Sequence, residues 1–298
     1  LLQTDLANSE PIKVPSRYNT VSFLSDFGTR DEFVGVVHSV LHNIAPHVDV
    51  IDITHGIPAH DVRAGSLALA RSVEYLCPGI VLAVVDPGVG TERKRIAVEV
   101  GEGESVLIGP DNGLLAPAVA MVGGPKRVVE LTNLDFQLNG PSTTFDGRDV
   151  FAPAAAHLVN GVDITELGEV IDPNGLVPAL IPVSYLEGEA LHTEILWIDQ
   201  YGNIQLNIGP EDLPPDELQI KIDDQMYSVD RVTAFEQISE GGLGFIVNST
   251  GLIEIAACRS SAANELRACI GDSIQIVKAS RDSGISTPVA LQSKKENS

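Results

Sequence analysis

Hydrophobic and polar residues follow two different patterns along this chain, and the change between them predicts two domains. In the first half, short apolar runs alternate with stretches whose apolar residues recur every three or four positions, which is the spacing of an amphipathic helix. Strands that alternate with helices predict an α/β domain with a largely parallel sheet. The expected strands span 21–24, 48–53, 80–85, 95–100, 105–108 and 127–131, and the expected helices span 33–44, 60–76, 113–121 and 150–160.

The second half consists of short strand-like runs bounded by turn residues. It follows a segment rich in Pro, Gly and Leu, residues 173–182, which predicts a linker. Regularly spaced short strands predict a small antiparallel sandwich or barrel. The expected strands span 194–198, 204–208, 218–222, 226–232, 244–247, 252–256 and 273–277. We therefore expect a flexible lead-in over 1–19, an N-terminal α/β domain over 20–182, a C-terminal β domain over 190–278 and a polar tail over 279–298.

Charge and composition restrict the partners of the protein. The 298 residues include 41 acidic and 19 basic ones, for a net charge of -22. Such a field repels phosphate backbones, so we expect no nucleic-acid partner. No run approaches the length of apolar residues that a membrane span needs, so we expect none. Cys77, Cys258 and Cys269 form no CxxC pair, which argues against a disulfide framework and favours a cytoplasmic location.

Polar clusters follow several of the predicted strands. Three of them, 25–31, 86–90 and 109–113, come directly after apolar runs, and a fourth, 143–149, precedes a predicted helix. A single aspartate after a strand is most often a turn or helix-cap residue. In open α/β sheets, however, ligands bind beyond the carboxyl ends of the strands. Four clusters in one domain therefore predict a ligand site built from several loops.

Two histidines offer a candidate metal site on a helix. His38 and His42 are four residues apart in the predicted helix 33–44, so both could face one ion. The HExxH context that such a pair has in metalloproteases is absent. We therefore interpret both as ordinary helix histidines and predict no metal.

The polar clusters belong to an ordered set of motifs: SDFGTRD at 25–31, ITHGIPAHDV at 53–62, VDPGVG at 85–90, GPDNGLL at 109–115, TFDGRDVFAP at 144–153, DQYGN at 199–203 and NSTGLIEIA at 248–256. This set resembles the S-adenosyl-L-methionine (SAM) hydrolase family, the adenosine-forming relatives of fluorinase and chlorinase, over residues 21–277. The resemblance implies an N-terminal α/β domain and a C-terminal antiparallel β-barrel-like domain. It also implies an enzyme with SAM as its small-molecule substrate, no cofactor, and a homotrimer with active sites at the subunit interfaces.

The resemblance also implies roles for individual residues in binding the substrate. Asp26 corresponds to the residue that holds the ribose hydroxyls, and Asp31 to one near the methionine ammonium group. In the C-terminal domain Tyr201 and Phe235 would flank the adenine base, although without the resemblance they could be core aromatics of a barrel. The remaining expected substrate-binding residues are His60, Phe145, Asp199, Asn203, Ser249, Glu254 and Ala257.

The expected chemistry centres on Asp86. A sulfonium leaves as a neutral thioether and needs no general acid, whereas attacking water must lose a proton to a base. Relatives use an Asp–Arg–His set in which the arginine follows the aspartate by seven residues, which points to Asp86 and Arg93. Asp146 stands where the family pattern TFHGRD has histidine. We hypothesise that Asp86 and Arg93 position the water and that Asp146 substitutes weakly or only structurally; His60 is an alternative titrating group, so the identity of the base stays open.

Three other functions are compatible with parts of this pattern. A 5′-halogenase would have to bind a halide beside Asp86, and two like charges about 4 Å apart cost about 4 kcal/mol at an effective dielectric constant of 20. A non-catalytic protein that binds SAM or adenosine is favoured only by Asp146, which replaces the histidine of the family pattern. A metal-dependent hydrolase could use the many aspartates. A halogenated product would indicate the halogenase, and binding of SAM without turnover would indicate the non-catalytic protein. Activity that is unchanged after chelation would exclude the metal-dependent hydrolase.

Overall fold

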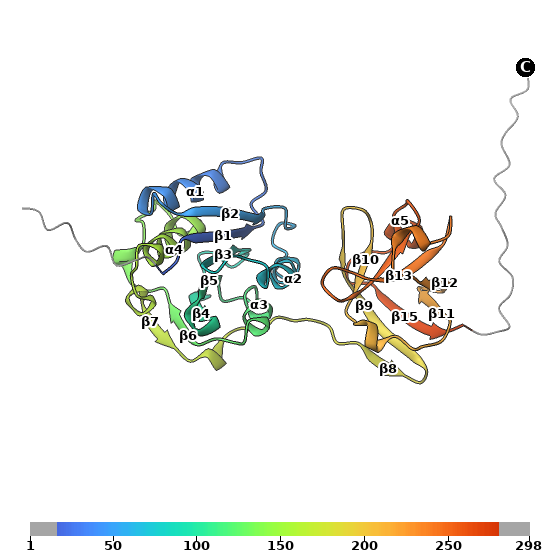
Figure 1. Ribbon diagram of the computed structural model, residues 1–298. Coiled ribbons are helices and arrows are strands. Elements are labelled where there is room, and N and C mark those ends of the chain that lie inside the picture. Colours follow the sequence, from blue (N-terminus) through green and yellow to red (C-terminus); the bar gives the residue numbers. More distant parts are fainter. Residues whose placement is uncertain (1–16, 280–298) are drawn as a thin grey trace, which may run out of the picture. The chain divides into compact units, whose positions relative to one another are not determined.

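The computed structural model describes residues 17–279. The expected lead-in up to residue 16 and the expected tail from residue 280 lie outside the described residues. The chain divides into two compact units between residues 181 and 182, and each unit is described by itself (Figure 1). Among residues 17–279, no helix combines the length and apolar character that crossing a membrane requires.

The N-terminal unit is built on a mixed seven-stranded sheet in the order β2-β1-β3-β5-β4-β6-β7. The strands β2, β1, β3 and β5 pair in parallel, and β4, β6 and β7 extend the sheet antiparallel. This confirms the predicted α/β fold with parallel strands and restricts the parallel part to one half of the sheet. The strands are β1 Thr20–Ser25, β2 Asp49–Thr54, β3 Ile80–Val84, β4 Arg95–Val100, β5 Ser105–Pro110, β6 Arg127–Glu130 and β7 Glu169–Ile171.

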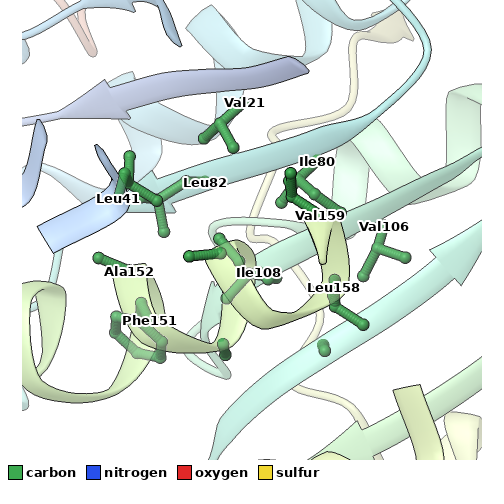
Figure 2. Packing of buried hydrophobic residues seen from close by; sticks show 14 of the residues in the cluster. Val21, Leu41, Ile80, Leu82, Val106, Ile108, Phe151, Ala152, Leu158 and Val159 are labelled. Atoms are coloured by element: carbon green, nitrogen blue, oxygen red, sulfur yellow. The ribbon is translucent and has the colours of Figure 1, made fainter. Parts of the chain in front are cut away.

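Helices cover both faces of this sheet. They are α1 Phe33–Ile44, α2 Val62–Val73, α3 Ala116–Met121 and α4 Ala152–Val159. The helices α1 and α4 lie on one face, and α2 and α3 lie on the other (Figure 1). Strands alternate their side chains between faces, so the buried Phe23 and Leu82 reach the core beneath α1 and α4. Figure 2 shows Phe151 and Leu158 packed into this core.

The C-terminal unit is a closed barrel. Its strands follow the order β10-β14-β13-β12-β11-β15-β9, and β9 also pairs with β10, so seven strands close on themselves while β8 extends from β9. Neighbouring strands pair antiparallel, apart from β12 and β13, which pair in parallel. This confirms the predicted β-barrel. The elements are β8 Tyr185–Glu187, β9 Ala190–Ile198, β10 Ile204–Leu206, β11 Leu218–Ile222, β12 Gln225–Arg231, β13 Leu243–Val247, β14 Ile253–Ala257, α5 Ala262–Leu266 and β15 Ser273–Lys278.

Candidate active site

A cavity of about 230 Å³ lies beyond the carboxyl ends of β1 and β3, where a parallel sheet is expected to bind its ligand. Three of the predicted clusters contribute to it through the loops after β1 and β3 and the segment before α4, and the loop after β2 and the start of α1 complete the lining. Its walls combine carboxylates with aromatic rings. The predicted site residues that line it are Asp26, His60, Asp86, Phe145 and Asp146.

A buried pair of carboxylates shares one arginine at this cavity. Arg93 donates from Nε to Asp86 Oδ1 at 2.8 Å, and its Nη2 donates both to Asp86 Oδ2 and to Asp146 Oδ2. The side chains of Asp86, Arg93 and Asp146 are only 6, 9 and 4% exposed. Two-point contacts between a guanidinium and a carboxylate fix both groups in orientation. The structure therefore brings together the three residues that the sequence singled out for catalysis.

A fourth member of this arrangement, Arg95, was not predicted. Its Nε donates to Asp146 Oδ2 at 2.8 Å, so Asp146 accepts from two guanidinium groups. Arg95 is the first residue of β4, and Arg93 precedes it by two positions, the spacing at which side chains of a strand point to the same side. That spacing was the available sequence signal. We call Asp86, Arg93, Arg95 and Asp146 the carboxylate–arginine cluster.

Local backbone geometry explains how Asp146 reaches the cluster. It immediately precedes a π-helical turn, Gly147–Phe151, which leads into α4. Such turns are rare and frequent at functional sites. A Cβ at Gly147 would lie 3.1 Å from the Phe27 ring and 3.2 Å from the Phe145 ring, so glycine allows both rings to line the cavity. The guanidinium of Arg93 lies over the ring of Phe151, with 5.5 Å between Arg93 Cζ and the ring centroid.

Burial and neighbouring charges together set the pKa of Asp86. Burial raises the pKa of Asp86 above its ordinary value, the hydrogen bonds and charge of Arg93 partly offset that rise, and the Asp146 carboxylate adds to it. A carboxylate whose pKa is raised toward 7 accepts a proton more readily than a carboxylate with the ordinary aspartate pKa. Asp86 is therefore suited to accept a proton.

The other predicted residues of this unit divide between the cavity and the surface. Asp26 Oδ2 accepts a hydrogen bond of 2.8 Å from the backbone N–H of His60, and His60 has a left-handed φ of 68°. Non-glycine residues in this conformation are uncommon and concentrate at functional sites. Phe145 packs edge-on against Phe27, with 5.6 Å between ring centroids. Asp31, by contrast, is exposed and does not line the cavity.

A second and larger cavity, about 1270 Å³, lies in the C-terminal unit. The predicted residues Asp199, Tyr201, Asn203, Phe235, Ser249, Glu254 and Ala257 line it. Asp199 Oδ1 accepts from the backbone N–H groups of Tyr201 at 2.8 Å and Asn203 at 2.9 Å, which shapes the loop between β9 and β10. Tyr201 and Phe235 are 71 and 54% exposed, so they are not core aromatics of the barrel. Exposed rings at a cavity are suited to stacking on a flat ligand.

Glu254 is the buried carboxyl group of this second cavity. Its side chain lies 3.4 Å from Asn248 Nδ2, at the limit of a hydrogen bond. Burial raises its pKa, the contact with Asn248 lowers it slightly, and the nearby Asp199 charge adds to the rise. Glu254 can therefore both accept and, when protonated, donate a hydrogen bond toward a bound ligand.

The loop of the second cavity depends on Gly202. This residue has a left-handed φ of 84°, and a Cβ there would come within 2.0 Å of Ser261 Oγ and 2.9 Å of Ser261 Cα. We expect Gly202→Ala to lower the free energy of unfolding of the barrel by more than about 1 kcal/mol, measured by urea unfolding. Gly251→Ala is the matched control, because Gly251 has a φ of 83° but open space around it. Equal losses in both variants would contradict a specific steric requirement at Gly202.

Comparison with known proteins gives a consistent match over both units. Residues 21–168 match the model of the SAM hydroxide adenosyltransferase N-terminal domain. Residues 193–275 match the SAM hydroxide adenosyltransferase C-terminal domain. Each cavity therefore lies in a unit that one of these domain models matches.

Individual relatives agree with these domains. A protein of Salinispora tropica named (R)-S-adenosyl-L-methionine hydrolase is 40% identical over 86% of this chain and 97% of its own length. One of the same name from Thermus thermophilus is 37% identical over 83% of this chain and 94% of its own length. A fluorinase of an Actinoplanes species is 25% identical over 92% of this chain and 99% of its own length. The crystal structure of an uncharacterized conserved protein from Thermotoga maritima superposes with a TM-score of 0.79 at 30% identity, over 87% of this chain and 100% of that chain.

Proposed function

Because the chain belongs to the SAM hydroxide adenosyltransferase family, we propose that it hydrolyses SAM to adenosine and L-methionine. Water or hydroxide attacks the ribose C5′ carbon and forms a C–O bond. The C5′–S bond breaks, and its electron pair neutralises the sulfonium, so methionine leaves as a thioether. The proton of the attacking water passes to a base. The observation that carries this proposal is the carboxylate–arginine cluster at the end of the parallel strands.

Within the cluster we assign the proton to Asp86 and a positioning role to Asp146. Asp86 is nearly buried and has a raised pKa, so it can take the proton. Asp146 accepts hydrogen bonds from both Arg93 and Arg95, and these contacts fix the position of the Arg93 guanidinium. Asp146 therefore anchors Arg93, which in turn orients Asp86. The cluster needs no histidine for this arrangement.

The cluster also favours water over a halide as the nucleophile. A halide beside the Asp86 carboxylate meets a repulsion of about 4 kcal/mol at 4 Å and an effective dielectric constant of 20. Water, in contrast, benefits from the same carboxylate as a proton acceptor. The fluorinase relatives are also less similar to this chain, at 25% identity against 40% for the hydrolase of Salinispora tropica.

The two cavities suggest how the substrate is recognised. In the N-terminal unit we propose that Asp26 holds the ribose hydroxyls beside His60 and Phe145, and that Asp31 lies near the methionine ammonium group. In the C-terminal unit we propose an adenine site, in which the exposed rings of Tyr201 and Phe235 stack on the base. The polar and small residues that complete this adenine site are Asp199, Asn203, Ser249, Glu254 and Ala257.

We further propose that the protein forms a homotrimer with active sites at the subunit interfaces. The trimer follows from the family resemblance, and light scattering coupled to size-exclusion chromatography tests it. We also propose a cytoplasmic location and a reaction at C5′ that uses no cofactor or metal. The cytoplasmic location is supported by Cys77, Cys258 and Cys269, which are all unpaired thiols. Displacement at a sulfonium needs no Lewis acid, because the leaving group departs neutral.

Chromatography of the reaction products tests the function directly. We expect purified protein, incubated with SAM in water enriched in oxygen-18, to release methionine and adenosine that carries the label at C5′. Because the relatives are named for the R form, each sulfonium epimer is assayed separately, with and without chloride. Chlorinated adenosine would support a halogenase instead. Intact substrate with saturable binding would indicate a non-catalytic binding protein.

The pH dependence of the reaction tests the assignment of the base. Because the pKa of Asp86 is raised, its ionised form disappears at a higher pH than that of an ordinary aspartate. We expect kcat/KM to fall as the pH decreases through this value, with the midpoint above the ordinary aspartate value of about 3.9. Initial rates measured across the acid range check this. A profile that stays flat down to that ordinary value would exclude Asp86 as the base.

A further inference from the structure

Three metal-binding side chains converge outside the proposed reaction site. His38 lies on α1, Asp52 lies on β2, and His55 follows the end of β2. Both His38 Nε2 and His55 Nε2 lie close to the same carboxylate oxygen, Asp52 Oδ1, at 2.9 and 3.0 Å. The three ligand atoms are within 4.8 Å of one another. We call these residues the histidine–aspartate cluster.

The buried imidazole of His55 gives the second observation that points to a cation ligand. Its side chain is only 5% exposed, and its Nε2 has no partner in hydrogen-bond geometry among the described residues, although Asp52 Oδ1 is 3.0 Å away. Its Nδ1 lies 2.8 Å from Ser25 Oγ. A proton on Nδ1, donated to Ser25, would leave an Nε2 lone pair facing a carboxylate. With this tautomer two electron-rich atoms face each other at 3.0 Å, and a cation bound between them removes their repulsion.

We propose that the histidine–aspartate cluster binds a divalent transition-metal ion such as Zn²⁺. Two imidazole nitrogens and one carboxylate oxygen are a preferred ligand set for zinc. Ligand atoms around tetrahedral zinc are about 3.3 Å apart, since zinc–ligand bonds measure about 2.0 Å. The two observed nitrogen–oxygen distances, 2.9 and 3.0 Å, are a few tenths of an ångström shorter than this, and the two histidine nitrogens lie within 4.8 Å of each other. Ser25 then serves as the outer partner that orients His55.

This ion would have a structural role. His38, Asp52 and His55 do not line the cavity that holds the carboxylate–arginine cluster, so the reaction at C5′ does not pass through the metal. An ion bound by them would connect α1 to β2, which is the edge strand of the sheet. It would thereby stabilise the end of the sheet, because a ligand that binds only the folded chain shifts the unfolding equilibrium.

In the sequence His38 and His42 lie one turn apart on the same helix, and we interpreted both as ordinary helix histidines. In the structure His42 is exposed and is not part of the cluster. This makes His42 a matched control. His42→Ala removes a histidine from α1 without touching the proposed ligands, whereas His38→Ala removes a partly exposed ligand with little effect expected on packing.

Cobalt titration of the untagged, chelator-treated full chain tests the site. We expect wild-type protein and His42→Ala to bind one equivalent of Co²⁺ with visible d–d absorption that one equivalent of Zn²⁺ abolishes. His38→Ala and Asp52→Asn should bind at least about tenfold more weakly. Zn²⁺ should raise the Tm of wild-type protein but not that of His38→Ala, and circular dichroism verifies that each variant is folded. Absence of stoichiometric absorption in wild-type protein, or undiminished binding by folded His38→Ala, would overturn the proposal.

Discussion

Replacing Asp86 with asparagine is expected to lower the turnover of SAM by at least about a hundredfold, the range that general-base groups contribute. Asparagine keeps the size of the side chain and can still contact Arg93, but it cannot accept the proton of the attacking water. Substrate binding should persist, because the proposed ribose and adenine contacts lie elsewhere. The effect should therefore appear in kcat and hardly in KM. Adenosine formation under saturating SAM measures it.

Two further variants make this result specific to Asp86. Asp135→Asn removes an exposed carboxylate of the same unit and should leave turnover unchanged. Asp146→Asn should reduce turnover less than Asp86→Asn, because Asp146 acts by holding Arg93. A loss of less than tenfold in Asp86→Asn and in Asp86→Ala would show that another group, such as His60, takes the proton.

Replacing Phe151 with alanine is expected to give the largest loss of stability, about 3–5 kcal/mol in the free energy of unfolding of the N-terminal unit. Phe151 is fully buried in the core beneath α1 and α4 (Figure 2). Its ring also supports the guanidinium of Arg93, with 5.5 Å from the ring centroid to Cζ. The substitution removes this support and leaves a cavity that the packed core cannot close. Turnover should therefore fall together with stability.

The two units can be followed separately in the same urea titration. Trp197, the single tryptophan, lies in β9 of the barrel, so its fluorescence reports the C-terminal unit. Hydrogen exchange in α4 and β3 reports the N-terminal unit. The exchange transition should move to lower urea in Phe151→Ala, while the fluorescence transition should not. Phe235→Ala is the control, because this exposed ring should change stability by no more than about 0.5 kcal/mol.

Elements with a strong local period could be predicted closely. The spacing of apolar residues predicts a helix over 33–44, and α1 has these bounds. Strands predicted over 95–100 and 218–222 correspond in the same way to β4 and β11. The elements that the sequence did not indicate are short: β7 and β8 have three residues each and α5 has five. Such lengths contain too few repeats for a period to be recognised.

Contacts between distant segments could not be derived from the sequence. Arg95 and Asp146 are 51 residues apart, and nothing in either motif requires them to meet. His38 pairs with Asp52 across 14 residues rather than with His42 on its own helix. Closure of the barrel depends on the pairing of β10 with both β9 and β14. Each of these contacts depends on how whole elements pack.

The sequence by itself determined the two-part architecture, the ordered family motifs and three members of the carboxylate–arginine cluster, because period and motif are properties of neighbouring residues. Only the tertiary structure decided that Asp146 lies between Arg93 and Arg95, that Asp86 is buried enough for its pKa to rise, and that two histidines face one carboxylate. Burial and charge pairing depend on groups brought together by the packing of strands and helices. They therefore follow from the fold and not from the local pattern.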